Sequence, residues 1–255
     1  MNKLRHTPIA LLTLAALTVG CNSGGGGGGG YKAKPVEKVA AITLTPGKED
    51  ELFPVKAGNQ WVYEAEAFQT TPQGQQSNKS TVTFQVTEVV DTPEGKLATI
   101  EVSSDEKLSD RLKWRVGPTG VYQMSGSTRD KIDSPLKEAG FEPAVPALPF
   151  PVKEGSEVVV TANGIRPGAG IGPFKAKVTI EGIQEVDSAM GRFNAVCVSS
   201  DQTYKEKDFD FRTVSTSFWV PKVGIVRYIQ EMVVTNPQGK TITTSSTMRL
   251  KSHSP

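Results

Sequence analysis

The side chains most often used for acid–base, nucleophilic and metal chemistry are scarce in this chain of 255 residues. Histidine occurs only at His6 and His253, and cysteine only at Cys21 and Cys197. If the first twenty residues are removed on export, His253 near the C-terminus is the one histidine left. A Ser-His-Asp triad, a papain-like Cys-His pair and a His-rich zinc site all need a histidine. We therefore expect no catalytic residue, no metal site and no cofactor.

Several short patterns imitate functional motifs. Ser103-Ser104-Asp105 and Ser199-Ser200-Asp201 pair a nucleophile type with an acid, but side chain–backbone bonds that end a strand explain them better. A Ser-Lys dyad would avoid histidine, yet no motif places a lysine beside a serine. Gly168–Gly172 is followed by Pro173 and a strand pattern, which indicates a surface loop and no dinucleotide site. The carboxylates at 208–210 and 48–51 lack calcium-loop spacing.

The N-terminus has the pattern of an export signal. Lys3 and Arg5 precede an uncharged, mostly apolar run of eleven residues from Ile9 to Val19, which is too short to span a bilayer as a mature helix. The run ends in Leu17-Thr18-Val19-Gly20-Cys21, which resembles a bacterial lipobox. In that motif the cysteine is lipidated, with palmitate among the acyl groups, and becomes the new N-terminus. Thr18 stands where leucine is most common, and the alternative is a plain signal peptide with a chance cysteine.

A glycine run follows the cysteine. Gly24 to Gly30 are seven consecutive glycines, which cannot pack into a core and form a flexible tether. We predict residues 1–20 as signal peptide and 21–52 as lipidated Cys21 plus tether, with a coil span of roughly 30 Å. These features place the protein in the bacterial cell envelope. Asn22 favours the outer membrane over the inner membrane under the enterobacterial rule.

The charge balance excludes one class of partner. Residues 1–20 hold Lys3, Arg5 and no acid, so the mature chain has 27 basic and 27 acidic residues. Nucleic-acid binders are usually basic with a clustered patch, and we expect no nucleic-acid partner. Cys197 is left without a disulfide partner and lies in the apolar run Phe193 to Val198. We expect it to be a buried, inert thiol.

The remainder of the chain contains an internal duplication. Phe53-Pro54-Val55-Lys56-Ala57-Gly58 recurs as Phe150-Pro151-Val152-Lys153-Glu154-Gly155, and Val82–Asp105 aligns without gaps onto Val178–Asp201 with nine of 24 positions identical. Trp114–Val121 corresponds to Trp219–Ile225. We predict one β unit at 53–125, a Pro-rich linker at 126–149 and a second β unit at 150–255.

Each unit shows strand patterns. Trp61–Phe68 is rich in β formers and Thr81–Val90 alternates with a period of two. Asp91 to Gly95 and Asp187 to Gly191 predict hairpin turns. A last hairpin joins 225–235 to 240–250, and the weak alternation of 240–250 indicates an edge strand. Residues 133–140 could form one or two helical turns. We predict an all-β fold with little helix. Its two tandem antiparallel units form curved sheets in a half-barrel or sandwich-like assembly.

One resemblance to known proteins rests on the first repeat. Phe53-Pro54-Val55-Lys56-x-Gly58-Asn59-x-Trp61-x-Tyr63-Glu64 resembles an opening motif of many uncharacterised bacterial lipoproteins and exported β proteins, and Trp219–Val226 resembles their closing strands. The second copy departs from the motif at Ser156, Val158 and Val160. The group implies an antiparallel, curved sheet. A more distant likeness, on architecture alone, is to the half-barrels of lipoprotein carriers, which hold acyl chains. No catalytic motif comes with either.

Four aromatic residues are the candidate ligand-groove residues: Trp61, Tyr63, Trp114 and Trp219. The alternative is that they are core aromatics. Our first functional hypothesis is a non-enzymatic, membrane-anchored envelope lipoprotein with a structural or interaction role and protein partners in the envelope. The second is a carrier or sensor that binds an acyl chain or other apolar ligand in a concave β face. An enzyme using Asp, Glu, Lys or Ser is third.

Overall fold

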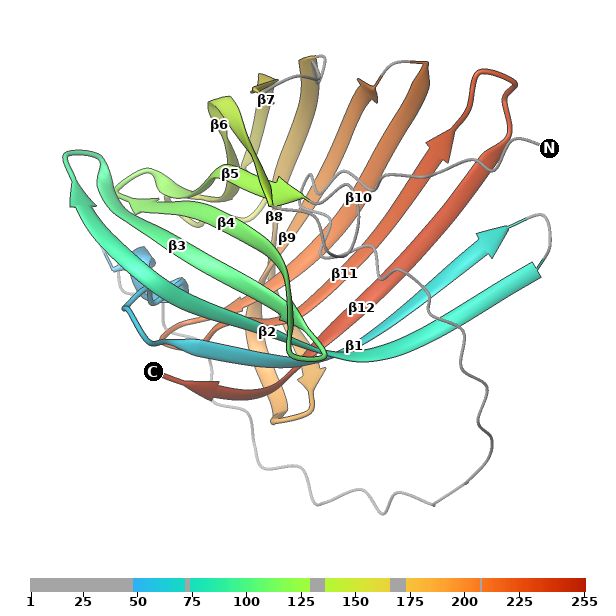
Figure 1. Ribbon diagram of the computed structural model, residues 1–255. Coiled ribbons are helices and arrows are strands. Elements are labelled where there is room, and N and C mark those ends of the chain that lie inside the picture. The colour runs from blue at the N-terminus through green and yellow to red at the C-terminus, as the bar shows by residue number, and fades with distance from the viewer. Residues whose placement is uncertain (1–47, 72–73, 129–135, 166–172, 207) are drawn as a thin grey trace, which may run out of the picture.

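The folded part of the chain is a closed β-barrel (Figure 1). The computed structural model describes residues 48–71, 74–128, 136–165, 173–206 and 208–255. The 3-10 helix η1 (Glu49–Leu52) precedes twelve strands: β1 (Gln60–Thr71), β2 (Gly74–Thr92), β3 (Gly95–Ser104), β4 (Lys107–Gly117), β5 (Gly120–Thr128), β6 (Lys137–Pro149), β7 (Glu157–Ile165), β8 (Pro173–Ser188), β9 (Gly191–Glu206), β10 (Phe209–Val220), β11 (Gly224–Thr235) and β12 (Thr241–Ser254). Each strand pairs antiparallel with its neighbours in sequence, and β1 pairs with β12.

The all-β, antiparallel prediction is confirmed, whereas the half-barrel or sandwich of two tandem units is wrong. The predicted edge strand, 240–250, belongs to β12, which pairs with both β11 and β1 and closes the barrel. Its weak alternation has another cause: half-buried serine and threonine side chains occupy positions on its inner face.

The segment 126–149 is mostly strand and not linker or helix. Residues 129–135 lie outside the described residues, but Lys137–Pro149 form β6. Among the described residues, β6 pairs with β5 over much of its length and with β7 through three residue pairs. Proline cannot donate a ladder hydrogen bond, so this short β6–β7 pairing is what lets Pro143, Pro146 and Pro149 lie in a barrel strand.

The repeated sequences take the same local structure in the two halves of the wall. Four backbone bonds correspond between them: Gly58 N donates to Val86 O (2.8 Å), Val86 N to Asn59 O (2.9 Å), Gly155 N to Ile180 O (2.8 Å) and Ile180 N to Ser156 O (2.9 Å). A β-bulge follows both Val86 and Ile180. Gly95 follows Val86 by nine positions, whereas Gly191 follows Ile180 by eleven. The gap-free sequence alignment of the two repeats therefore pairs the turn glycines, Gly95 and Gly191, but does not pair the bulge positions after Val86 and Ile180.

One end of the barrel is filled by an aromatic cluster, which we call the aromatic end: Phe53, Trp61, Trp114 and Trp219. The Phe53 ring lies 5.5 Å from Trp61, 5.0 Å from Trp114 and 5.6 Å from Trp219, measured between ring centroids. Leu52 is fully buried beside it. Packing thus begins before Phe53, and η1 belongs to the fold although we expected the tether to run to residue 52.

Candidate functional site

The four predicted groove aromatics all lie in the core. Trp61, Tyr63 and Trp219 are 1% exposed and Trp114 is 4% exposed. The Trp61 Nε1 donates to Val223 O (2.5 Å) and the Tyr63 hydroxyl donates to Ile225 O (2.9 Å). Burial raises the pKa of Tyr63 far above its usual value. In this structure the side chains fill the barrel end and pack against one another, as core aromatics do. A role for them in binding stays a prediction.

The described residues with potentially reactive side chains, Cys197 and His253, take part in packing. Cys197 is buried, and burial raises the pKa of its thiol to about 11, which fits the predicted inert thiol. The His253 ring stacks on Trp61 with centroids 5.4 Å apart, and burial lowers its pKa. Cys21 and Gly168–Gly172, which we predict to be a surface loop, lie outside the described residues.

The two serine–acid sequences differ in role. Asp105 Oδ1 accepts a hydrogen bond from Thr81 N (2.9 Å) in the turn that ends β3, as we expected for a strand terminator. Asp201 instead lies within β9 and forms an ion pair with Arg212 (2.8 Å), so the same expectation for the second copy is wrong.

The inner face of the barrel carries uncharged polar side chains on β9, β10, β11, β12, β1 and β2. They form two adjacent rows, in which each residue lies directly opposite the next on the neighbouring strand. We call these rows the polar belt: Ser200, Ser215, Gln230, Ser246, Ala67 and Asn78 in the first, and Gln202, Thr213, Met232, Thr244, Gln69 and Gln76 in the second, with Ala67 and Met232 as the two apolar members. No position in either row is charged.

Apolar side chains flank the polar belt on both sides. Toward the aromatic end the next row is mostly apolar, with Val198, Tyr228, Met248 and Ala65 beside Ser217 and Ser80. Toward the opposite end lie Tyr204 and Phe211, whose rings stack with centroids 4.6 Å apart and an interplanar angle of 4°. The belt is therefore a polar zone between two apolar ones.

Buried polar atoms that have no hydrogen-bond partner within the described residues include Gln123 Nε2, Thr213 Oγ1 and Gln230 Oε1. Their side chains are 1%, 2% and 5% exposed. Thr213 and Gln230 belong to the polar belt. Gln123, on β5, lies opposite the core residue Trp114. Buried polar groups usually have partners, and an unsatisfied one costs about 1–3 kcal/mol.

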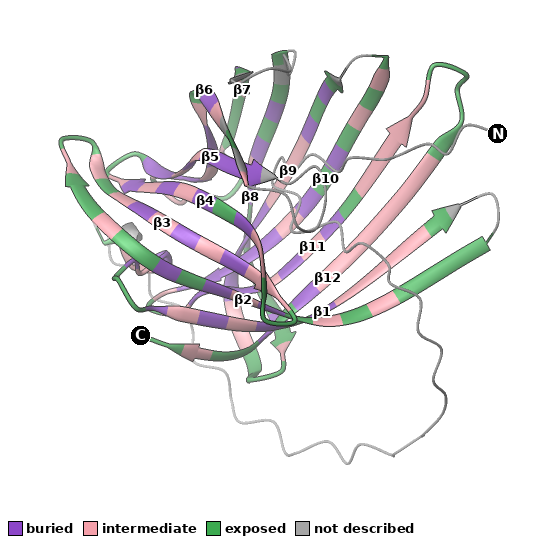
Figure 2. Cartoon of the chain, viewed as in Figure 1, coloured by how far each residue is buried: buried purple, intermediate pink, exposed green. Residues whose placement is uncertain are grey.

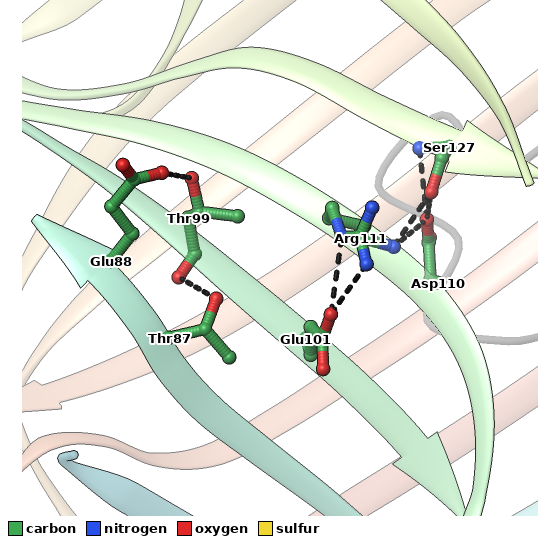
Figure 3. Close-up of polar contacts among 7 residues, drawn as sticks. All are labelled: Thr87, Glu88, Thr99, Glu101, Asp110, Arg111 and Ser127. Atoms are coloured by element: carbon green, nitrogen blue, oxygen red, sulfur yellow. Dashed lines mark hydrogen bonds and ion pairs between the residues drawn. The ribbon is translucent and has the colours of Figure 1, made fainter. Parts of the chain in front are cut away.

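Asp110 is the one charged residue among the buried side chains of the described segments (Figure 3). Its Oδ1 accepts hydrogen bonds from Arg111 N (2.7 Å), Ser127 N (2.9 Å) and Ser127 Oγ (3.0 Å). The β4–β5 ladder stops at Lys113 and Ser125, so this carboxyl group joins the strands where direct pairing has ended. Burial raises its pKa to about 7, against the opposing effect of the hydrogen bonds. Its contacts indicate a structural brace.

A hollow of about 500 Å³ lies against β1, β2 and β12. Its charged lining residues are Glu64, Glu66, Lys79, Asp105 and Arg249. Lys79 Nζ lies 3.4 Å from Glu66 Oε1, so charges of both signs lie side by side there. Among the described residues, no three His, Cys, Asp or Glu side chains gather as a metal site. None of the helices in the described segments has the length and hydropathy to cross a bilayer.

Sequence reasoning missed the polar belt because hydrophobicity gives the wrong face of β10. Thr213, Ser215 and Ser217 point inward and are buried, while Val214 is 39% exposed. An interpretation that places valine inside inverts the strand. The sequence held one usable clue. Trp219 stands an even number of residues after Ser215 and Ser217, so it lies on the same face of the strand, and a large aromatic residue marks the inner face better than one valine.

Comparisons with known proteins give structural likenesses alone. No known family and no curated protein matches the sequence. A protein of Parabacteroides distasonis, provisionally described as a lipoprotein, is 12% identical with a TM-score of 0.46. A provisionally described exported protein of Bacteroides fragilis with a YmcC-like fold is 14% identical with a TM-score of 0.46. Each likeness covers 80% of this chain and 98% of the other. No residue role is transferred from either protein.

Proposed function

We propose that the protein is a bacterial cell-envelope lipoprotein that acts by binding and not by catalysis. The observation that carries the proposal is the order of segments: a signal-like N-terminus, a lipobox-like sequence ending at Cys21, seven glycines, and then a barrel whose described core includes Leu52 and Phe53. Each buried acyl CH₂ contributes about 0.8 kcal/mol to membrane affinity, so two or more chains hold firmly. The tether then keeps the barrel clear of the headgroups.

The charged side chains on the outer surface of the barrel favour a location of the barrel in water. Cross-strand ion pairs lie on this surface, including Arg111–Glu101 (2.6 Å), Lys177–Glu157 (2.6 Å) and Arg212–Asp201 (2.8 Å). All six side chains are at least 31% exposed. Such pairs contribute little to stability, typically about 0–1 kcal/mol, but they favour a hydrated surface.

The packing of the reactive groups favours binding over catalysis. His253 is stacked on Trp61, Asp110 Oδ1 is held by three donors, and Cys197 is buried. A general base needs a basic atom within reach of its substrate, and none of these three side chains lines the hollow against β1, β2 and β12.

Membrane fractionation of two cysteine variants tests the anchor. Cys21→Ser should release the protein from membranes and abolish the lipid mass on the chain. Cys197→Ser is the matched control, because it removes the only other cysteine and should leave the protein in the membrane fraction. If Cys21→Ser stays in the membrane with unchanged mass, the lipoprotein proposal is wrong.

A carrier or sensor of an acyl chain is the second candidate, and the barrel interior is the feature that weighs against it. The apolar space at the aromatic end is filled by the chain's own rings. An alkyl chain along the polar belt would satisfy neither Thr213 nor Gln230, both of which are already buried without partners. The interior therefore supports the binding of a polar ligand better than the binding of an acyl chain.

A further inference from the structure

We infer that the polar belt is the binding site for an uncharged, hydroxyl-rich ligand, a neutral oligosaccharide, held on the inner face of the barrel. The inference rests on the proposed binding function and names its ligand class. It is carried by the rows of paired Ser, Thr, Gln and Asn side chains and by the buried atoms among them that lack partners.

The absence of charge from both rows selects a neutral ligand. A carboxylate, phosphate or ammonium group in the belt would leave water with no counter-charge beside it, which is strongly unfavourable. Asp110, the one buried charged side chain of the described segments, is already engaged by three hydrogen-bond donors. Outward-facing neighbours such as Arg212 and Arg227 flank the belt strands but do not belong to either row.

The unpartnered atoms select hydroxyl groups. Within the belt, Gln230 Oε1 is an acceptor and Thr213 Oγ1 can be donor or acceptor. A hydroxyl both donates and accepts, so a polyhydroxylated ligand can satisfy both atoms, whereas an alkyl chain satisfies neither. At the edge of the belt the partly buried Phe211 ring, stacked on the buried Tyr204, offers an apolar surface of the kind that the C–H face of a sugar ring covers.

The length of the belt and the exposure of one of its ends indicate an extended ligand that can enter the site from solvent. Each row crosses six strands, which is roughly 24 Å at the usual strand spacing. Exposure rises along the second row, from Thr213 and Gln202 at 2% to Gln76, which is exposed. Figure 2 shows the far parts of β11, β12 and β1 as largely intermediate in burial. The belt thus leads from the interior to the β1–β2 side of the barrel.

The test is glycan binding by the full-length lipidated protein in a detergent without a sugar headgroup. The probes are an array of neutral oligosaccharides, an array of acidic oligosaccharides, and palmitate. We expect neutral oligosaccharides alone to bind. Thr213→Val should weaken their binding about tenfold, because it removes one buried hydrogen bond and nothing of the shape. The matched control is Thr216→Val, on the opposite face of the same strand, which should bind like the wild type.

Several results would overturn the inference. The first is that no neutral oligosaccharide binds at millimolar concentration. The second is that the protein prefers acidic oligosaccharides or palmitate. The third is that Thr213→Val and Thr216→Val bind equally well. If Thr213→Val does not fold, Gln230→Leu takes its place. The Cys21→Ser fractionation is independent of these assays. A protein that is lipid-anchored but binds no neutral oligosaccharide overturns this inference and leaves the lipoprotein proposal standing.

Discussion

Loss of the Phe53 side chain should damage the barrel more than its position outside the strands suggests. The ring is 4% exposed and contacts Trp61, Trp114 and Trp219 with centroid distances of 5.0–5.6 Å. Removing a buried phenylalanine side chain costs the transfer free energy plus the cavity, about 3–5 kcal/mol in total. Because the three indoles hold the ring on several sides, we expect Phe53→Ala to lower the free energy of unfolding by about 4 kcal/mol.

The duplication supplies a matched control. Phe150 holds the same place in the second repeat, but its side chain is half-buried and packs at the margin of the same core. Fully burying a phenylalanine is worth about 1.5–3 kcal/mol, so Phe150→Ala should cost roughly 1–2 kcal/mol. The two substitutions are chemically identical, and they remove side chains that differ in burial.

Urea unfolding followed by tryptophan fluorescence measures both variants. All three tryptophans of the chain lie in the aromatic end, so their emission reports on the packing that the substitution disturbs. We expect unchanged urea dependence and a lower midpoint. If Phe53→Ala stays within about 1 kcal/mol of the wild type, or if Phe150→Ala costs as much, Phe53 does not hold this end of the barrel together.

Three further predictions use other features of the barrel. A Cβ at Gly95 would lie 2.2 Å from Val116 O, whereas a Cβ at the repeat-equivalent Gly191 would have nothing within 4 Å, and both glycines have φ near +130°. Gly95→Ala should therefore lower the stability by roughly 2 kcal/mol more than Gly191→Ala, as measured by thermal unfolding. Equal losses of stability would contradict this prediction. The pKa of Asp110 rises from its ordinary 3.8 to about 7 on folding, so the folded state binds the extra proton between these values and stability should fall as pH increases from about 4 to about 7. Asp110→Asn should flatten that part of the denaturation midpoint plotted against pH, and an unchanged slope would refute the assignment. Thr213→Val should leave the ligand-free barrel as stable as the wild type or up to about 1 kcal/mol more stable, since it removes an unpartnered buried hydroxyl; a clear loss of stability in calorimetry would show that the hydroxyl has a partner.

Local strand structure could be predicted wherever one face of a strand is apolar. Val82, Phe84 and Val86 alternate in sequence and are all buried in β2. The turns at Gly95 and Gly191 could be predicted as well, because their positive φ values of 128° and 130° need glycine. These features depend on a few neighbouring residues, which is why one sequence is enough to find them.

Closure of the barrel could not be predicted, because it depends on strands that break the usual pattern. β12 presents Ser246 and Thr244 to the interior, so its sequence looked like that of an edge strand. β6 contains three prolines and looked like a linker, but it needs few ladder bonds to β7. The polar belt was missed for the same reason: hydrophobic periodicity marks apolar interiors and gives no sign of a polar one.

The most direct test of an anchored, ligand-binding barrel is native mass spectrometry of the protein isolated from its own membranes. We expect a chain that lacks residues 1–20 and carries a lipid on Cys21. We also expect a discrete extra mass of neutral sugar units that denaturation removes. A chain that retains residues 1–20, or one whose Cys21 is bare and whose barrel holds no adduct, would contradict the account.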